Sequence, residues 1–261
     1  MMMNYKLGIA AAALLLVAGP TYADPVTFFG EDLNGNPNAV LASHPNSDTA
    51  RTSFFSNLIG VDTETFESFS ANQAPPLNIA FTGAGNAQIL NTDPNPQDFI
   101  DVENWGGGTN GAGRFAISGQ QYLEVDSSGF VINFDNPNGI AAFGFYGTDI
   151  GDFGGALSLT LTAMDGTTVT LPVPDSIGSG TGTPQDGSVI YFGFFDTAKT
   201  YKSIAFNNDQ GGVDNFGFDD FSVGSLAQVQ PGPTVPEPSS LITLAGAGLL
   251  AVVALRRRQA R

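Results

Sequence analysis

The stretch GALSLTLTAMDGTTVTLPV, from Gly155 to Val173, contains two runs in which apolar and polar residues alternate. Alternation with a period of two is typical of a β-strand that buries one face. The turn-forming residues Asp165 and Gly166 lie between the two runs. The stretch therefore predicts a β-hairpin.

The register of this hairpin follows from the length of its loop. A two-residue loop would pair Leu161 with Thr170 and so place an apolar side chain opposite a polar one. A three-residue loop over 164–166 pairs Leu161 with Val169 instead. It also puts Gly166 in the left-handed conformation that such loops need. We therefore expect the three-residue loop.

Seven further stretches have the composition of short strands separated by turn residues. This pattern favours an all-β fold, specifically an antiparallel β-sandwich of jelly-roll type. The seven stretches are 113–119, 121–126, 130–135, 140–147, 189–195, 201–206 and 216–224.

One short helix is expected near the N-terminus. Asn46 or Ser47 can cap its first turn, and Gly60 can end it. The apolar residues that share one face of this helix are Phe54, Phe55, Leu58 and Ile59.

The N-terminus has the layout of a secretory signal peptide. Lys6 supplies a positive charge, the apolar stretch 7–18 follows, and the small residue Ala23 precedes a cleavage site. We expect residues 1–23 to be removed, so that the mature chain begins at Asp24.

The segment between the two ends is strongly acidic. From Asp24 to Val235 the chain has four basic residues against 24 acidic ones, a net charge of −20. Such a surface repels phosphate backbones, so nucleic acid is excluded as a partner. The chain has no cysteine, and therefore neither disulfides nor thiolate metal sites are available to it.

The C-terminus combines an apolar run with a basic end. The fifteen uncharged residues 241–255 would span about 22 Å as a helix, against about 30 Å for a bilayer core. Residues 239–255 thus form a minimal transmembrane helix. The basic residues that should remain on the cytoplasmic side are Arg256, Arg257, Arg258 and Arg261.

The tail resembles a PEP-CTERM sorting signal, because a motif, an apolar segment and a basic cluster occur in that order. The motif consists of Val235, Pro236, Glu237 and Pro238. The resemblance implies export in a Gram-negative bacterium, a transient hold in the inner membrane, and recognition by an exosortase-type membrane enzyme. A plain C-terminal anchor, which is not cleaved, is the alternative.

These boundaries divide the chain into four parts. Residues 1–23 form the signal peptide and 24–224 the β-sandwich ectodomain. A linker at 225–234 joins the ectodomain to the sorting signal at 235–261.

The body also resembles exported PEP-CTERM sandwich proteins, in the segments 28–34, 63–69, 143–155 and 214–223. In such proteins a segment like 143–155 precedes a strand pair, and one like 214–223 forms the last strand.

Aspartates among glycines suggest a calcium site in this body. Asp149, Asp152 and Asp219 could converge on the cation, because carboxylate oxygens are ligands that calcium prefers. In the alternative reading these aspartates cap turns. The stretch from Asp32 to Ser43 lacks the glycine and glutamate of an EF-hand, so we expect an Asx-rich turn there.

Other functional residues are sparse. Trp105 and Tyr146 are candidates for stacking on a sugar ring. His44, the one histidine, precedes the expected helix and is expected on the surface. No G-x-S-x-G motif surrounds a serine, and no nucleophile–base arrangement is evident.

We therefore expect an exported, non-enzymatic protein of the cell surface or extracellular matrix. One alternative is a module that binds extracellular polysaccharide with the help of calcium. A secreted enzyme acting on glycans is a weaker alternative.

Overall fold

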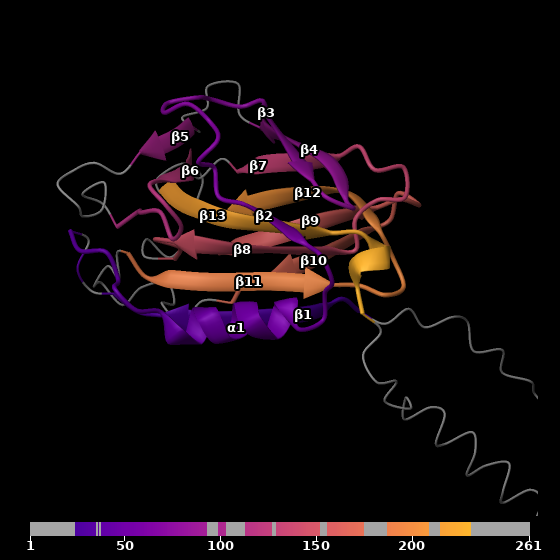
Figure 1. Ribbon diagram of the computed structural model, residues 1–261, viewed down its shortest axis with the longest axis horizontal. Helices are drawn as coiled ribbons and strands as arrows, with labels where there is room; N and C mark the ends of the chain where they lie inside the picture. Colours follow the sequence, from indigo (N-terminus) through magenta and orange to yellow (C-terminus); the bar gives the residue numbers. More distant parts are fainter. Residues whose placement is uncertain are drawn as a thin grey trace, which may run out of the picture.

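Thirteen β-strands in two antiparallel sheets and an eleven-residue α-helix form the described part of the chain (Figure 1). The computed structural model describes residues 24–34, 36, 38–92, 99–102, 113–126, 129–151, 156–174, 187–208 and 215–230. The expected signal peptide, sorting motif and transmembrane helix lie outside these residues. Within them, no helix has the length and apolar character that a membrane crossing requires.

A seven-stranded sheet forms one layer of the sandwich. Its strands are β1 (Val26–Asp32), β2 (Asp62–Glu64), β5 (Phe99–Val102), β6 (Gln121–Asp126), β8 (Ala142–Thr148), β11 (Val189–Phe195) and β13 (Asn215–Gly224). Neighbouring strands follow in the order β1, β11, β8, β13, β6, β5, and β2 also pairs with β13.

A six-stranded sheet forms the other layer. Its strands are β3 (Leu77–Phe81), β4 (Gly85–Asn91), β7 (Phe130–Phe134), β9 (Leu157–Ala163), β10 (Thr168–Pro172) and β12 (Tyr201–Asn208). They follow in the order β10, β9, β12, β7, β4, β3.

The last eight strands form four nested antiparallel pairs: β6 with β13, β7 with β12, β8 with β11, and β9 with β10. From β6 to β9, and again from β10 to β13, the chain alternates between the two sheets. This nesting is the topology of a jelly roll, in which the hairpin β9–β10 is the innermost pair. The expected all-β sandwich of two antiparallel sheets is confirmed.

The hairpin has the expected register. Leu161 pairs with Val169, and Leu159 pairs with Leu171. The three-residue loop is closed by Ala163 and Thr167, and Gly166 has a φ of +84°. Side-chain alternation across a short turn was therefore sufficient to fix this pairing.

The strand prediction for 113–119 is wrong, since residues 113–120 form an irregular segment. The amides of Ile117 and Ser118 donate hydrogen bonds to the carboxylate of Asp219 instead of to a neighbouring strand. The first five strands, β1 to β5, were not predicted as strands. β2 has only three residues, and polar side chains make up most of the outward positions of β3 and β4.

The helix α1 (Pro45–Phe55) is present, but its ends differ from the prediction. The carboxylate of Asp32 on β1 accepts hydrogen bonds from the amides of Asn46 and Ser47, at 3.2 and 2.9 Å, so neither residue is the N-cap. The hydroxyl of Ser47 donates to β1 and β11 instead. A carboxylate at this position also complements the positive end of the helix dipole.

The helix ends earlier than Gly60, because Leu58 pairs with Val229 in a short antiparallel bridge. Ser225 caps the 3-10 turn at Leu226–Gln228 through a capping box. Residues 225–230, which we expected to be linker, therefore pack onto the sandwich.

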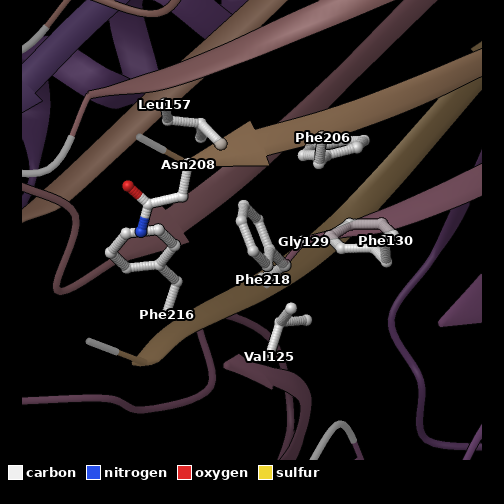
Figure 2. A pocket seen from close by; sticks show the side chains of 8 residues that line it. All are labelled: Val125, Gly129, Phe130, Leu157, Phe206, Asn208, Phe216 and Phe218. Atoms are coloured by element: carbon white, nitrogen blue, oxygen red, sulfur yellow. The ribbon is translucent and has the colours of Figure 1, made fainter. Parts of the chain in front are cut away.

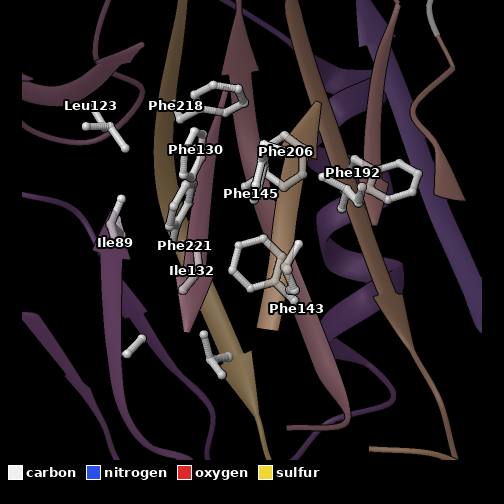
Figure 3. Packing of buried hydrophobic residues seen from close by; sticks show 14 of the residues in the cluster. Ile89, Leu123, Phe130, Ile132, Phe143, Phe145, Phe192, Phe206, Phe218 and Phe221 are labelled. Carbon is white, nitrogen blue, oxygen red and sulfur yellow. The ribbon is translucent and has the colours of Figure 1, made fainter. Parts of the chain in front are cut away.

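Phenylalanine rings fill the space between the two sheets (Figure 3). Phe206 from β12 stacks on Phe130 from β7 with ring centroids 4.2 Å apart. It also meets the edges of Phe145 and Phe218 from the opposite sheet, at 5.3 and 5.4 Å. These rings are buried, and their contacts join the two layers.

Candidate functional site

Asp149 and Asp219, two of the acidic residues singled out from the sequence, lie on the outer face of the seven-stranded sheet. The helix α1 covers one part of this face, along β1 and β11, as Figure 1 shows. The irregular segment 113–120 contacts another part, over β13, β6 and β8. The polar side chains between the sheet and these two segments are mostly buried.

Arg114 is at the centre of the first polar cluster. Its Nε donates to Glu124 Oε2 at 3.1 Å, and its Nη1 donates to Asp149 Oδ2 at 2.9 Å. The side chain of Arg114 is 12% exposed, and the side chains of Glu124 and Asp149 are 8% and 2% exposed. Tyr122 donates to Asp101 and Glu124 beside them. The cluster joins segment 113–120 to β6 and β8 by buried charge-assisted hydrogen bonds.

Asp219 is at the centre of the second cluster, where β13 has a bulge. Its Oδ2 accepts the amides of Ile117 and Ser118, both at 2.8 Å, and its Oδ1 accepts the amide of Asp220. Asp220 has a φ of +55°, which is unusual for a residue with a side chain. The bulge thus turns Asp219 toward segment 113–120 and holds that segment on the sheet.

Tyr146, which we expected to be exposed for stacking on a sugar, is buried under α1 with 2% of its surface accessible. Its hydroxyl donates to Asp48 at 2.6 Å, and its ring packs against Tyr191. This correction has a physical cause. Tyr146 alternates with the core residue Phe145, so it points to the outer face, and there the helix covers it.

His44 lies at the N-terminal end of α1, with its Nδ1 at 3.0 Å from Asp48 Oδ1 and its side chain 20% exposed. It is therefore less exposed than expected. The Asx-rich turn after β1 is confirmed by hydrogen bonds from the amide of Asn36 to Asn34 and from the amide of Asn38 to Asn36.

The calcium site remains a prediction. Asp149 directly follows β8, and β8 is a neighbour of β13, which carries Asp219, as the site requires. Both carboxylates already bind protein groups, and Asp152 lies outside the described residues. In the part of the chain that the structure describes, no three His, Asp or Glu side chains are grouped closely enough to hold a metal. Trp105, the sorting motif and the terminal arginines also lie outside that part.

Stability should depend on pH through the Asp219–Asp220 pair. Burial raises the pKa of Asp219 well above its usual range, with a further contribution from the charge of Asp220. Burial also raises the pKa of Asp220, against a hydrogen bond from Ser118 and the attraction of Arg51. In the pH range above the carboxyl pKa of the unfolded chain, about 4, the folded protein binds more protons than the unfolded chain. The contribution of this pair to stability is therefore full below that range and decreases as pH rises toward the pKa values of the folded state.

The substitution Asp220→Asn should make stability decrease less steeply as pH rises. The measurement is the melting temperature between pH 4 and pH 7 in EDTA, with Asp24→Asn as a control for net charge, because Asp24 is exposed. A slope equal to that of the Asp24→Asn protein would contradict the assignment.

An apolar cavity lies between the sheets near the end of the core (Figure 2). Its lining includes Phe130, Phe206, Phe216 and Phe218, and its volume is about 10 Å³. That is about the space of one water probe, so the cavity has no room for a substrate.

The outer face of the six-stranded sheet was not singled out from the sequence. Its strands place one uncharged polar side chain each in a row across the sheet. We name this set the neutral row: Thr168, Thr162, Ser203, Asn133, Gln88 and Asn78. The signal for it was present in the sequence, as hydroxyl and amide residues at alternate positions of nearly uncharged strands.

Comparison with solved structures found similarity at low TM-scores. The K2 cleaved adhesin domain of Lys-gingipain is 16% identical with a TM-score of 0.41, covering 62% of this chain and 97% of that domain. The C-terminal family 22 carbohydrate binding module of Clostridium thermocellum Xyn10B is 12% identical with a TM-score of 0.34, covering 65% and 97%. The CBM22-1 xylan-binding domain of Paenibacillus barcinonensis Xyn10C is 11% identical with a TM-score of 0.34, covering 66% and 96%. Similarity this low assigns no function to the chain.

Comparison of the sequence with curated proteins found no match. A family model for the PEP-CTERM protein-sorting motif matches residues 234–258. This range contains the Val-Pro-Glu-Pro stretch, the apolar run and the first three arginines of the tail. The chain is therefore a protein with a PEP-CTERM sorting motif, which follows the β-sandwich.

Proposed function

We propose that this chain is an exported, non-enzymatic protein of the cell surface or extracellular matrix. The observation that carries the proposal is the PEP-CTERM motif at residues 234–258, just after the last described residue of the sandwich, Gln230. The signal-peptide pattern of residues 1–23 agrees with it. An exosortase-type enzyme of the inner membrane cleaves the tail near the Pro-Glu-Pro stretch and releases the mature body.

The contacts of the buried charges support a structural role rather than catalysis. Arg114 and Asp219 attach segment 113–120 to the sheet, and Asp32 holds the first turn of α1. A general acid or base has to reach a substrate proton. These carboxylates are 9% exposed or less, and their oxygens accept hydrogen bonds from the protein itself.

The role of the sorting motif can be tested in the native host by changing Pro236, Glu237 and Pro238 to alanine together. The wild-type protein should reach the surface fraction in shortened form. The triple variant should keep its full length and stay in the membrane fraction, because the processing enzyme no longer has its recognition stretch.

The matched control changes Pro231 and Pro233 to alanine, since these prolines precede the motif. This control should be processed like the wild type. Equal processing of the triple variant, or a wild-type protein confined to the cytoplasm, would contradict the proposal.

A further inference from the structure

Charge is distributed very unevenly between the two sheets. The six strands β3, β4, β7, β9, β10 and β12 contain one charged residue, Lys202. The body as a whole has a net charge of −20. In the seven-stranded sheet, by contrast, Asp32, Glu124, Asp219 and Asp220 all lie within strands. Apart from the exposed Lys202, the six-stranded sheet therefore gives a strongly acidic protein one face without charged strand residues.

The neutral row runs across all six strands of this face. Pairing between strands aligns Thr168 with Thr162, Thr162 with Ser203, and Ser203 with Asn133. The row continues from Asn133 to Gln88 and from Gln88 to Asn78. All six side chains are exposed or half-buried. Five strand spacings of about 4.8 Å give the row a length of about 24 Å.

An apolar strip lies beside the neutral row, one pair of residues further along the strands. It consists of Ala205, Val131 and Leu90, which pair with one another across β12, β7 and β4 and are half-buried. Thr160 and Thr170 extend it across β9 and β10. Hydroxyl and amide groups beside small apolar groups match a sugar chain, whose ring edges carry hydroxyls and whose ring faces carry C–H groups.

We infer that the outer face of the six-stranded sheet binds a neutral polysaccharide, with the sugar chain lying along the neutral row. The amide and hydroxyl groups donate to and accept from sugar hydroxyls. Displacing water from uncharged groups costs less free energy than stripping it from charges. Two hydrogen bonds order the surface before binding, from Gln88 to Asn78 and from Asn207 to Thr160.

The surface of the sheet has a depression at the end of the neutral row that carries the amide side chains. Asn78, Gln88 and Asn133, with Asn86 and Asp135 at the rim, line a depression of about 280 Å³. Asp135 accepts two hydrogen bonds from Asn86, so its carboxylate is held by the protein. The depression gives one sugar unit a place to enter the surface among amide groups.

Charge and composition favour a neutral polysaccharide over two other ligands, a second copy of this chain and an acidic polysaccharide. A second copy would bring a further body of charge −20, which opposes association. The strip also has no aromatic residue of the kind that forms the centre of protein–protein interfaces. An acidic polysaccharide would be repelled by the body.

The inference rests on the proposed function, because the chain meets extracellular polysaccharide only after export. Polysaccharide binding and export are tested separately, since binding is measured with purified protein and export is measured in cells. The full chain, purified in mild detergent, is run by affinity electrophoresis through gels that contain glucomannan, xyloglucan or starch. Alginate serves as the acidic comparison, and cellulose and chitin are used in pull-downs.

The test variant combines Gln88→Glu with Asn133→Asp, two substitutions that keep side-chain shape and add charge to the row. Asn38→Asp with Asn72→Asp is the control, since it adds the same charge at exposed positions off this sheet. The wild type and the control should bind at least one neutral polymer. The test variant should bind it at least tenfold more weakly, with an unchanged circular dichroism spectrum.

Several results would overturn the inference. They are binding to alginate alone, no binding of the wild type to any of the neutral polymers, and equal loss of binding in the control. Concentration-dependent dimerisation that the test variant abolishes would show instead that a second copy occupies this face.

Discussion

Arg114→Met is expected to lower the free energy of unfolding by about 3–5 kcal/mol, the cost of breaking a buried ion pair from one side. The guanidinium lies between Glu124 and Asp149, whose side chains are 8% and 2% exposed. Methionine fills much of the same space but supplies no charge and no donor. Both carboxylates would then stay buried without the cation that faces them. Chemical denaturation monitored by circular dichroism measures the loss.

Arg51→Met is the matched control for this substitution. Arg51 is 36% exposed and lies 3.9 Å from Asp220, so solvent screens its interaction. Its loss should cost less than about 1 kcal/mol. Adding Asp149→Asn to Arg114→Met should recover part of the stability, because one of the two buried charges is then absent. Equal losses for the two arginines would contradict the assigned role of Arg114.

Phe206→Ala should cost a similar amount, about 3–5 kcal/mol, which is the usual range for removing a buried aromatic ring. The ring of Phe206 meets Phe130 from its own sheet and Phe143, Phe145 and Phe218 from the other sheet (Figure 3). Truncation removes the apolar contact and leaves a cavity between the layers. The decrease in denaturant midpoint, at unchanged slope, measures this loss.

Two control variants test whether the loss of stability depends on the volume removed and on the position of the ring in the core. Phe206→Leu keeps part of the volume and should cost less than Phe206→Ala. Phe29→Ala removes a ring that is 37% exposed on the edge strand β1, and its effect should be smaller still. A loss at Phe29 as large as that at Phe206 would contradict the position of Phe206 at the centre of the core.

Local patterns in the sequence predicted the later strands well. In the hairpin β9–β10, the alternation of Leu159 and Leu161 with threonines left one register in which apolar residues face each other. This information lies within about twenty residues of chain, so it can be read from the sequence directly. Strands β6 to β13 all fall within stretches predicted to be strands, or within two residues of them.

Long-range partners account for what the sequence did not reveal. Residues 113–119 alternate like a strand, but Asp219, about a hundred residues later, binds the amides of Ile117 and Ser118. Likewise Asp32 determines where α1 begins, and the helix buries Tyr146. Each of these outcomes depends on which segment covers the outer face of the seven-stranded sheet. Alternation shows that a side chain points outward, but it does not show what lies above it.

The neutral row likewise depends on information that the local sequence does not contain. Thr162, Thr168, Asn133 and Ser203 were visible as polar residues at alternate positions of predicted strands, but the order of strands in the sheet was not. Asn78 and Gln88 lie on β3 and β4, which were not predicted as strands. Only the pairing of β9 with β12, and of β12 with β7, brings threonine, serine and asparagine from distant segments into one line. Once that order is known, the lack of charge on this face distinguishes it from the rest of the body.

The central claim is that this acidic sandwich is exported and processed at both ends. Intact-mass analysis of the protein from the surface fraction of its own host tests it most directly. The expected mass is that of a chain starting at Asp24 and ending near Pro236–Pro238, without the apolar run and the arginines, plus any group added at the new C-terminus. A mass corresponding to Met1–Arg261, found only in the cytoplasmic fraction, would contradict the account.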